Sequence, residues 1–132
     1  AFVHEWRDRG GKLHMVASKG WRDTVPLLDE AEILEFFHPA ETAPSAVFGV
    51  MDVEAWAVRR LLRSVRPRLA EKMEFIGYYN TPWSRAGDPP FSSVDLNLEE
   101  LASRACEALR QTLLGSGAIQ AVHHVRPKLI IR

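Results

Sequence analysis

The sequence lacks an excess of either charge, because its 17 lysines and arginines are balanced by 17 aspartates and glutamates in 132 residues. A chain that binds the phosphates of duplex DNA normally has more lysines and arginines than aspartates and glutamates, since phosphates are contacted mainly by cationic side chains. The sequence also shows no recognition helix of a DNA-binding motif. We therefore expect that this chain alone does not bind duplex DNA specifically.

Cysteine and long apolar runs are also scarce. The single cysteine, Cys106, excludes an internal disulfide and fits a reducing compartment. No apolar run approaches the length of a membrane span, and the first residues lack the basic head and apolar core of a signal peptide. These absences favour a cytoplasmic location. Residues 1–7 instead have the pattern of the interior of a helix, which predicts that the sequence begins inside a domain.

No catalytic or metal-binding constellation is evident. His123 and His124 are neighbours, and neighbouring side chains in a strand point to opposite faces, so the pair cannot easily share one metal ion. Cys106 has no evident base nearby, and a small packing residue explains it better than a nucleophile. The serines at 92 and 93 lack a Gly-x-Ser-x-Gly setting, and no phosphate-binding loop is present. The sequence therefore predicts no enzyme, no metal and no cofactor.

Helical and extended patterns alternate along the chain. Helices are expected at residues 2–6, 25–37, 53–65 and 97–114, and strands at residues 13–17, 46–50, 73–78, 93–96 and 128–131. The strands are short apolar runs rather than alternating ones, and the run at 46–50 reads as fully buried. This pattern predicts an α/β fold with three layers, in which helices flank a mostly parallel sheet.

Two helix starts carry capping residues. Asp52 precedes an apolar stripe and is expected to cap the helix at 53–65, a contribution of about 1 kcal/mol. Asn97 is followed three positions later by Glu100, which is the spacing of a capping box. Pro26 is expected in the first turn of the helix at 25–37, where proline is tolerated.

Candidate ligand-binding residues follow from the strand ends. In open α/β sheets, ligands bind beyond the carboxyl ends of the strands. Aromatic side chains there, such as Trp21, Tyr79 and Trp83, can stack on a flat or sugar-like ligand. The alternative, equally compatible with the spacing, is that Trp21 and Trp83 cover a sheet edge or a subunit contact. The candidate ligand-binding residues are Trp21, Met51, Asp52, Tyr79 and Asn80.

Five segments, in order and at matching distances, resemble signatures of the lactose-repressor/galactose-repressor (LacI/GalR) family. They are Ala46–Ala57, Met73–Pro82, Asp88–Val94, Glu99–Leu109 and Pro127–Arg132. The first resembles a buried strand that ends in Asn-Asp before a helix, and the second resembles V-S-V-V-G-[FY]-D-[DN]-x-P. The third resembles T-P-P-L-T-T-V, the fourth the amphipathic helix that follows it, and the last a closing P-x-L-V-x-R strand. Together they lie within residues 46–132.

The resemblance implies the effector-binding domain of a transcriptional regulator. That domain has two lobes of the periplasmic-binding-protein type, forms a dimer, and controls DNA binding by an N-terminal helix-turn-helix that this sequence does not contain. Its effector is a small molecule, such as a sugar or a related metabolite. Residues 1–96 would then belong to the C-terminal lobe, the helix at 97–114 to the other lobe, and residues 115–132 to a loop and closing strand.

Two other functions compete with this one. A solute-binding protein of a transport system shares the lobe fold, and a signal peptide rather than a helix-turn-helix upstream of Ala1 would favour it. The other is an α/β enzyme with catalytic residues elsewhere, but no residue supports it.

Three residues depart from the family pattern: Met51, Tyr79 and Leu96 stand where the family commonly has polar groups that contact the effector. Because buried sugar hydroxyls need paired polar groups, either the ligand is less polar or the pocket has lost its small-molecule role.

The resemblance also implies two associations. Trp56, Arg60 and Trp83 fall in the segments that form the dimer interface of this lobe, and tryptophan is enriched at interface centres. The helix at 97–114 carries an apolar stripe that needs cover, because such a helix draws most of its stability from burying that face. We expect it to fold back onto its own sheet or to pack against another copy.

Overall fold

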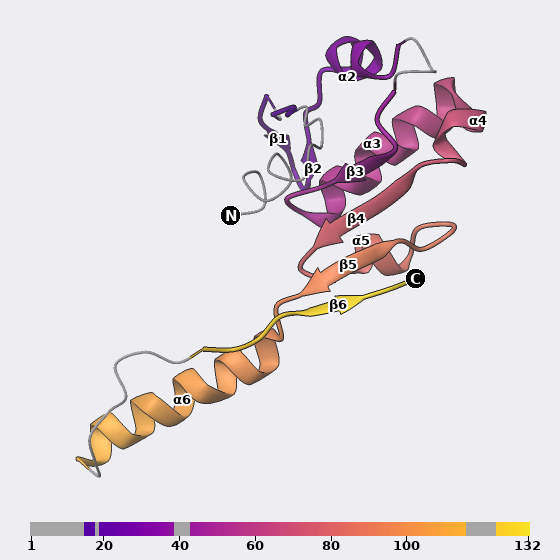
Figure 1. Cartoon of the computed structure of the whole chain (residues 1–132). Coiled ribbons are helices and arrows are strands. Elements are labelled where there is room, and N and C mark those ends of the chain that lie inside the picture. Colours follow the sequence, from indigo (N-terminus) through magenta and orange to yellow (C-terminus); the bar gives the residue numbers. More distant parts are fainter. Residues whose placement is uncertain (1–14, 18, 39–42, 116–123) are drawn as a thin grey trace, which may run out of the picture. The chain divides into compact units, whose positions relative to one another are not determined.

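The computed structural model describes residues 15–17, 19–38, 43–115 and 124–132 (Figure 1). It divides into two compact units, one of Ala1–Ala46 with Ala57–Met73 and the other of Val47–Trp56 with Glu74–Arg132. The helix expected at 2–6 lies outside the described residues, as does part of the strand expected at 13–17, whose described part is not a strand. No helix in the described ranges is long and apolar enough to cross a membrane.

The first unit opens with a hairpin that the sequence patterns did not predict. Strand β1 (Trp21–Arg22) pairs antiparallel with β2 (Val25–Pro26), across a turn in which Asp23 has a φ of 54°. The backbone pairing continues beyond the two strands, because the Lys19 N–H donates a hydrogen bond to the Leu27 carbonyl. The helix expected from residue 25 is therefore wrong at its start. Pro26 lies in a strand, because the left-handed turn at Asp23 reverses the chain before a helix can begin.

Helix α2 (Glu30–Phe36) follows, and its start is set by Asp29, whose side chain accepts a hydrogen bond from the Glu32 N–H at 3.1 Å. The buried side chains of this unit come from α2, from α3 (Asp52–Val65), from α4 (Pro67–Ala70) and from the segments beside them. They are Ile33, Phe37, Leu62, Ala70 and Met73, and Pro26 of β2 is buried as well. Arg66 ties the unit together, because its Nη1 donates to the Phe37 carbonyl at 2.5 Å.

The main sheet has four strands in the order β3-β4-β5-β6, namely β3 (Ala46–Phe48), β4 (Glu74–Tyr78), β5 (Ser92–Asp95) and β6 (Lys128–Ile130). Strands β4 and β5 are parallel, with Ile76 opposite Ser92, and β6 closes antiparallel to β5. The short helix α5 (Pro82–Arg85) connects β4 to β5. The second unit buries Val53, Ala55, Phe75 and Phe91. This is an α/β fold with a mostly parallel sheet and flanking helices, as the sequence predicts.

Strand β3 differs from its expected burial. The apolar run at 46–50 predicts a fully buried strand, yet Phe48 is 42% exposed and Val50 is 68% exposed. The reason is its place in the sheet: β3 is the outermost described strand, so only β4 lies beside it. The pairing continues one residue past the strand, because the Gly49 N–H donates to the Ile76 carbonyl at 2.9 Å.

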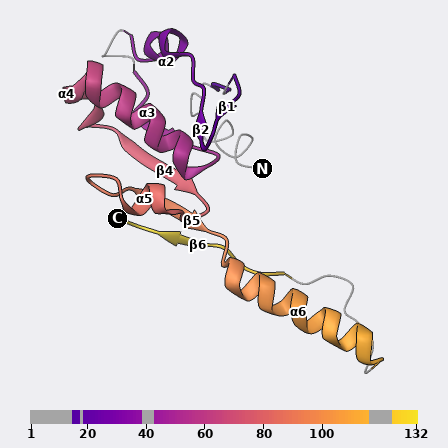
Figure 2. The same ribbon diagram turned by 180° about the vertical axis from the view of Figure 1, so that it is seen from behind.

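Helix α6 (Leu98–Leu114) runs beyond the ends of β5 and β6 in both views (Figures 1 and 2). None of its residues is buried, and Leu113 is 77% exposed. The expectation that the helix folds back onto its own sheet is therefore wrong. Cys106 is also exposed, so a packing role for it is wrong too. That another copy or another lobe covers the stripe stays a prediction.

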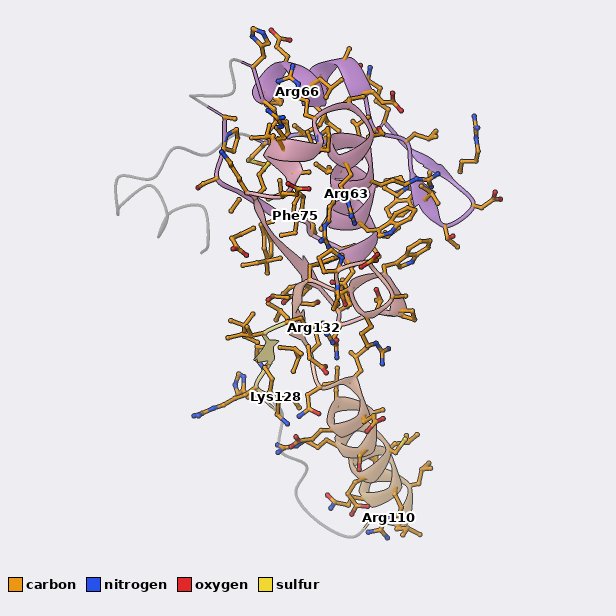
Figure 3. The ribbon with its side chains drawn as sticks, turned by 90° about the vertical axis from the view of Figure 1, so that its right-hand side faces the viewer. Arg63, Arg66, Phe75, Arg110, Lys128 and Arg132 are labelled. Atoms are coloured by element: carbon orange, nitrogen blue, oxygen red, sulfur yellow. The ribbon has the colours of Figure 1, made fainter. Side chains whose placement is uncertain are left out.

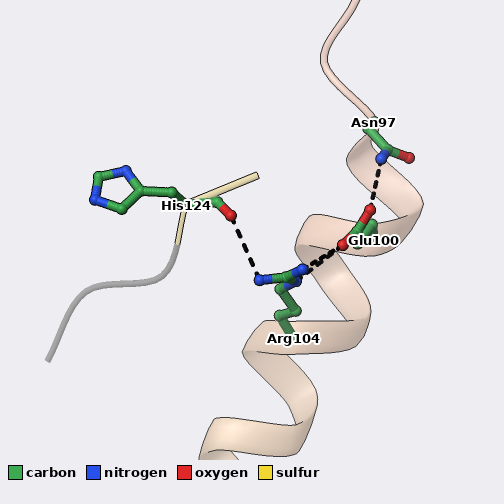
Figure 4. Close-up of polar contacts among 4 residues, drawn as sticks. All are labelled: Asn97, Glu100, Arg104 and His124. Carbon is green, nitrogen blue, oxygen red and sulfur yellow. Dashed lines mark hydrogen bonds and ion pairs between the residues drawn. The ribbon is translucent and has the colours of Figure 1, made fainter. Parts of the chain in front are cut away.

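The start of α6 differs from the predicted capping box (Figure 4). Asn97 has a left-handed φ of 55°, and its N–H donates to Asp95 Oδ1 at 2.7 Å. The capping box predicted here is not formed. Because Asn97 is left-handed rather than extended, its Nδ2 donates to Glu100 Oε2 at 2.7 Å and its side chain does not cap the backbone. Hydrogen bonds from Arg104, whose Nε lies 3.0 Å from Glu100 Oε1, lower the pKa of the Glu100 carboxyl.

Candidate ligand-binding edge

Asp52 is a fully buried polar residue at the edge where β3 and β4 end. Its Oδ2 accepts hydrogen bonds from the Thr81 N–H at 2.5 Å and from the Thr81 hydroxyl at 2.8 Å. Its Oδ1 accepts one from the Ser93 hydroxyl at 2.6 Å. The carboxylate therefore joins the first turn of α3 to the loop after β4 and to β5.

The expected capping role of Asp52 is wrong. Its two carboxylate oxygens accept from Thr81 and Ser93 rather than from a backbone N–H of its own helix. The carboxylate is held there because the buried Ser93 hydroxyl and the half-buried Thr81 donors need an acceptor. The Glu54 side chain instead satisfies a backbone donor at the start of α3: its Oε2 accepts a hydrogen bond from the Met51 N–H at 3.2 Å.

Gly77 makes room for this carboxylate. A Cβ at position 77 would lie 2.0 Å from Asp52 Oδ1 and 2.9 Å from Asp52 Cα. Both separations are far inside van der Waals contact, so only glycine lets β4 approach the start of α3 this closely. The close approach holds Met51 and Asp52 beside the end of β4.

Asn80 uses its backbone N–H and both polar atoms of its side-chain amide within the protein. Its N–H donates to the Ser93 hydroxyl oxygen at 3.0 Å, and its Nδ2 donates to Asp95 Oδ2 at 2.9 Å. Its Oδ1 accepts from Arg132 Nη2 at 2.6 Å. Figure 3 labels Lys128, where β6 begins, and Arg132, which follows the last residue of β6 by two positions. Asn80 therefore acts as a positioning residue, and its side-chain amide has little left to offer a ligand.

Tyr79 and Asn80 form a left-handed pair directly after β4, with φ values of 88° and 50°. Positive φ is an outlier for a bulky aromatic residue, and such strained residues gather at functional sites. The Tyr79 N–H holds the turn by donating to the Val94 carbonyl at 2.8 Å. The tyrosine side chain is 40% exposed at this edge.

Four of the five candidate ligand residues thus lie in the second unit: Met51, Asp52, Tyr79 and Asn80. Of these, Met51 and Tyr79 keep accessible side chains, whereas Asp52 is fully buried. Trp21 belongs to the first unit, where it lies on β1 and is 46% exposed, and its part in a ligand site stays a prediction.

Sequence reasoning missed three residues that organise this edge: Thr81, Ser93 and Arg132. Ser93 was interpreted as the entry of a strand, and Thr81 and Arg132 were quoted only as members of family motifs. A hydroxyl three residues beyond the end of β4 and another within β5 carry no periodic signal. Their partners lie 29 and 41 residues away along the chain, so no local pattern could pair them with Asp52.

The three residues expected at a dimer interface are also placed. Trp56 in α3 and Trp83 in α5 contact each other, with ring centroids 4.6 Å apart and ring planes at 50°. Both side chains are partly exposed. Arg60 follows Trp56 by four residues in the same helix and is exposed.

Asp95 gives this edge a pH-dependent element. Hydrogen bonds from the Asn97 N–H and then from Asn80 Nδ2 hold the pKa of its carboxyl below the ordinary value of 3.8. Because the pKa of the folded state is depressed, the stabilisation by Asp95 is present above the ordinary pKa and is lost as pH falls through the folded pKa.

Replacing Asn80 by alanine should raise the pKa of Asp95, as measured by carboxyl NMR titration. A Glu99→Gln control should leave it unchanged, and an unaltered Asp95 titration in the Asn80 variant would refute this assignment.

No group of three histidine, cysteine, aspartate or glutamate side chains that could hold a metal ion occurs within the part of the chain that the structure describes. His123 lies outside that part. The fold and the edge together are those of an α/β protein of the ligand-binding class, with accessible side chains at the carboxyl ends of its strands.

Comparisons with known proteins give the family. The sequence matches the family described as periplasmic binding protein-like domain over residues 1–132. It is 30% identical over 92 residues to the HTH-type transcriptional repressor PurR of Pasteurella multocida (strain Pm70), a match that covers 70% of this chain and 28% of that protein. The chain therefore belongs to the periplasmic binding protein-like family, and the resemblance to LacI/GalR regulators is confirmed. The curated relative named here is a transcriptional repressor.

Solved structures share the fold. A regulatory protein of the LacI family from Chloroflexus aggregans superposes with a TM-score of 0.79 at 20% identity, covering 99% of this chain and 47% of that one. A LacI family transcriptional regulator from Arthrobacter sp. FB24 in complex with lactose superposes with a TM-score of 0.78 at 17% identity, covering 98% and 48%. The chain thus spans less than half the length of these proteins.

Proposed function

We propose that this chain is part of the effector-sensing domain of a cytoplasmic LacI-type transcriptional regulator. A small molecule binds at the carboxyl edge of β3 and β4 and thereby controls DNA binding by a helix-turn-helix outside this chain. The observation that carries the proposal is the buried Asp52 carboxylate, which ties the start of α3, the loop after β4 and strand β5 into one edge.

The chemistry of the edge supports ligand binding. A binding site needs side chains held in place before the ligand arrives, so that little ordering entropy is lost on binding. Asp52 and Asn80 provide this order through their internal hydrogen bonds, while Met51 and Tyr79 present accessible side chains. A relative with the same fold is described as a complex with lactose, which favours a sugar or a related metabolite as effector.

The test is stabilisation of the chain by ligand. Thermal unfolding should be measured with lactose, phenyl β-D-glucopyranoside and indole, each over a concentration series. A bound ligand at 100 times its Kd should add about 2.7 kcal/mol to the free energy of unfolding. Replacing Leu113 by serine, at an exposed position of α6, serves as the control and should leave the response intact. Failure of every compound to raise the unfolding temperature at any concentration would refute the proposal.

We also propose that the chain self-associates through Trp56, Arg60 and Trp83. The two tryptophan rings, in contact at a tilt of 50°, form a large and partly exposed apolar anchor, of the kind that contributes most at interface centres. Arg60 would supply a polar contact at its margin.

Sedimentation equilibrium tests this association. The chain should form a dimer, and Trp83→Ser should weaken it by about 30-fold, because loss of a central anchor costs about 2 kcal/mol or more. Trp21→Ser removes a comparable exposed tryptophan and should leave the dimer unchanged. Circular dichroism shows whether each variant is folded. A chain that stays monomeric at high concentration, or a Trp83 variant that dimerises normally, would contradict the assignment.

A further inference from the structure

Three aromatic rings follow one another along the edge where β3 and β4 end. The Phe48 and Tyr78 rings lie 6.4 Å apart at 73°, and the Tyr78 and Tyr79 rings lie 5.1 Å apart at 86°. Each ring thus meets the next edge to face, which is a favourable arrangement for aromatic pairs. Val50 adds an exposed apolar side chain two residues after Phe48. We call Phe48, Val50, Tyr78 and Tyr79 the aromatic edge.

The polar groups beside the aromatic edge are already engaged. Both carboxylate oxygens of Asp52 accept hydrogen bonds from Thr81 and Ser93. The side-chain amide of Asn80 bonds Asp95 and Arg132. A ligand that offered only hydroxyl groups here would lose its bound water without gaining these partners, which is unfavourable.

The backbone holds the Tyr79 ring outward. With a φ of 88°, Tyr79 occupies a conformation that a tyrosine seldom adopts, and the turn is fixed by hydrogen bonds from Tyr79 to Val94 and from Asn80 to Ser93. The edge-on contact with Tyr78 further fixes the ring. A ring that is both fixed and 40% exposed offers a flat apolar surface at little cost in side-chain entropy.

We infer that the effector presents a planar, apolar ring to this edge and packs it against Tyr79, so that the ligand class is an aryl or heteroaryl compound, including aryl glycosides, rather than a simple sugar. The inference rests on the function proposed above and specifies the ligand class for the same site. The aromatic edge supplies the contact area, and the hydrogen-bonded Asp52 and Asn80 hold it in place without contacting the ring.

The experiment compares two glucosides that differ only in their aglycone. Calorimetric titration with phenyl β-D-glucopyranoside and with methyl β-D-glucopyranoside should show about tenfold or greater preference for the phenyl compound, because the phenyl ring adds both a ring contact and buried apolar area; tenfold corresponds to about 1.4 kcal/mol. Tyr79→Phe keeps the ring and should keep the preference. Tyr79→Asn removes the ring, while asparagine tolerates positive φ, so the backbone should stay in place and the preference should disappear. Leu113→Ser is the control and should behave as the unaltered chain.

The outcomes separate the two proposals. If the methyl compound or lactose binds as tightly as the phenyl compound, or if the preference survives in Tyr79→Asn, the inference is overturned and the proposed function stands. If no compound binds, the proposed function falls and the inference falls with it. If Tyr79→Asn instead turns a dimer into a monomer in sedimentation, the aromatic edge contacts a second copy of the chain, and the inference is likewise overturned.

Discussion

Replacing Asp52 by alanine is expected to lower the free energy of unfolding of this chain by about 3 kcal/mol or more. The variant would leave the Thr81 N–H, the Thr81 hydroxyl and the Ser93 hydroxyl without their acceptor at a buried site. Each unsatisfied buried donor costs about 1–3 kcal/mol, although the two hydroxyls can turn to other acceptors. Urea unfolding followed by tryptophan fluorescence measures the change.

Asp29 provides the matched control. Its carboxylate caps α2 at the surface, so Asp29→Ala should cost only about 1 kcal/mol. Asp52→Asn keeps the volume of the side chain and one acceptor oxygen, and it should fall between the two. Equal losses for Asp52→Ala and Asp29→Ala would show that the buried network contributes nothing beyond an ordinary cap.

Most of the regular elements could be predicted from the sequence, because their signals are local. The apolar run that ends in Tyr78 predicts β4, and leucines at helical spacing up to Gly115 predict α6 within one residue of its observed start. The first hairpin was missed for an equally local reason. Its strands are two residues long, too short for any period to appear, and its turn depends on the left-handed backbone of Asp23.

The candidate site could be predicted only where it follows strand ends. Met51 and Tyr79 are predicted because they come directly after apolar strands, and both have accessible side chains; their contact with a ligand stays a prediction. The role of Asn80 could not be predicted, because its partner Arg132 is 52 residues away along the chain. Such long-range polar pairs depend on strand order and register, which no local pattern encodes.

The apolar stripe of α6 shows a different limit. Its periodicity correctly predicts an amphipathic helix, but amphipathicity states only that a face needs cover, and it does not identify the covering surface. Leu109 and Leu113 remain exposed in the described chain, while the opposite charges of Glu107 and Arg110 pair on the same helix. Hydrogen bonds from Arg110 and Gln111 lower the pKa of Glu107 to about 2.

Replacing Gly77 by alanine is expected to be at least as damaging as the loss of Asp52. The new methyl group would lie 2.0 Å from Asp52 Oδ1 and 2.9 Å from Asp52 Cα, so both a side chain and a backbone segment would have to move. Overpacking of this kind costs about 1–3 kcal/mol or more, and displacing Asp52 would also break its hydrogen bonds to Thr81 and Ser93. Circular dichroism and urea unfolding measure the effect.

Gly87→Ala is the control for this substitution, because its nearest contact would be the Pro89 carbonyl oxygen at 3.3 Å, a neighbour that needs to give by only a few tenths of an ångström. It should change the free energy of unfolding much less than Gly77→Ala does. If both glycine variants were equally stable, the close approach of β4 to the start of α3 would not be a determinant of this fold.

The two large effects should also be coupled, because both act through the Asp52 carboxylate. In an Asp52→Ala background the oxygen 2.0 Å from the new Cβ is gone, and only the contact with Asp52 Cα at 2.9 Å remains. Adding Gly77→Ala should therefore cost less there than in the unaltered chain. The difference should reach about 0.5–3 kcal/mol, the usual range for residues in direct contact. Additive losses in this double-mutant cycle would mean that Gly77 is required for a reason other than the space it leaves for Asp52.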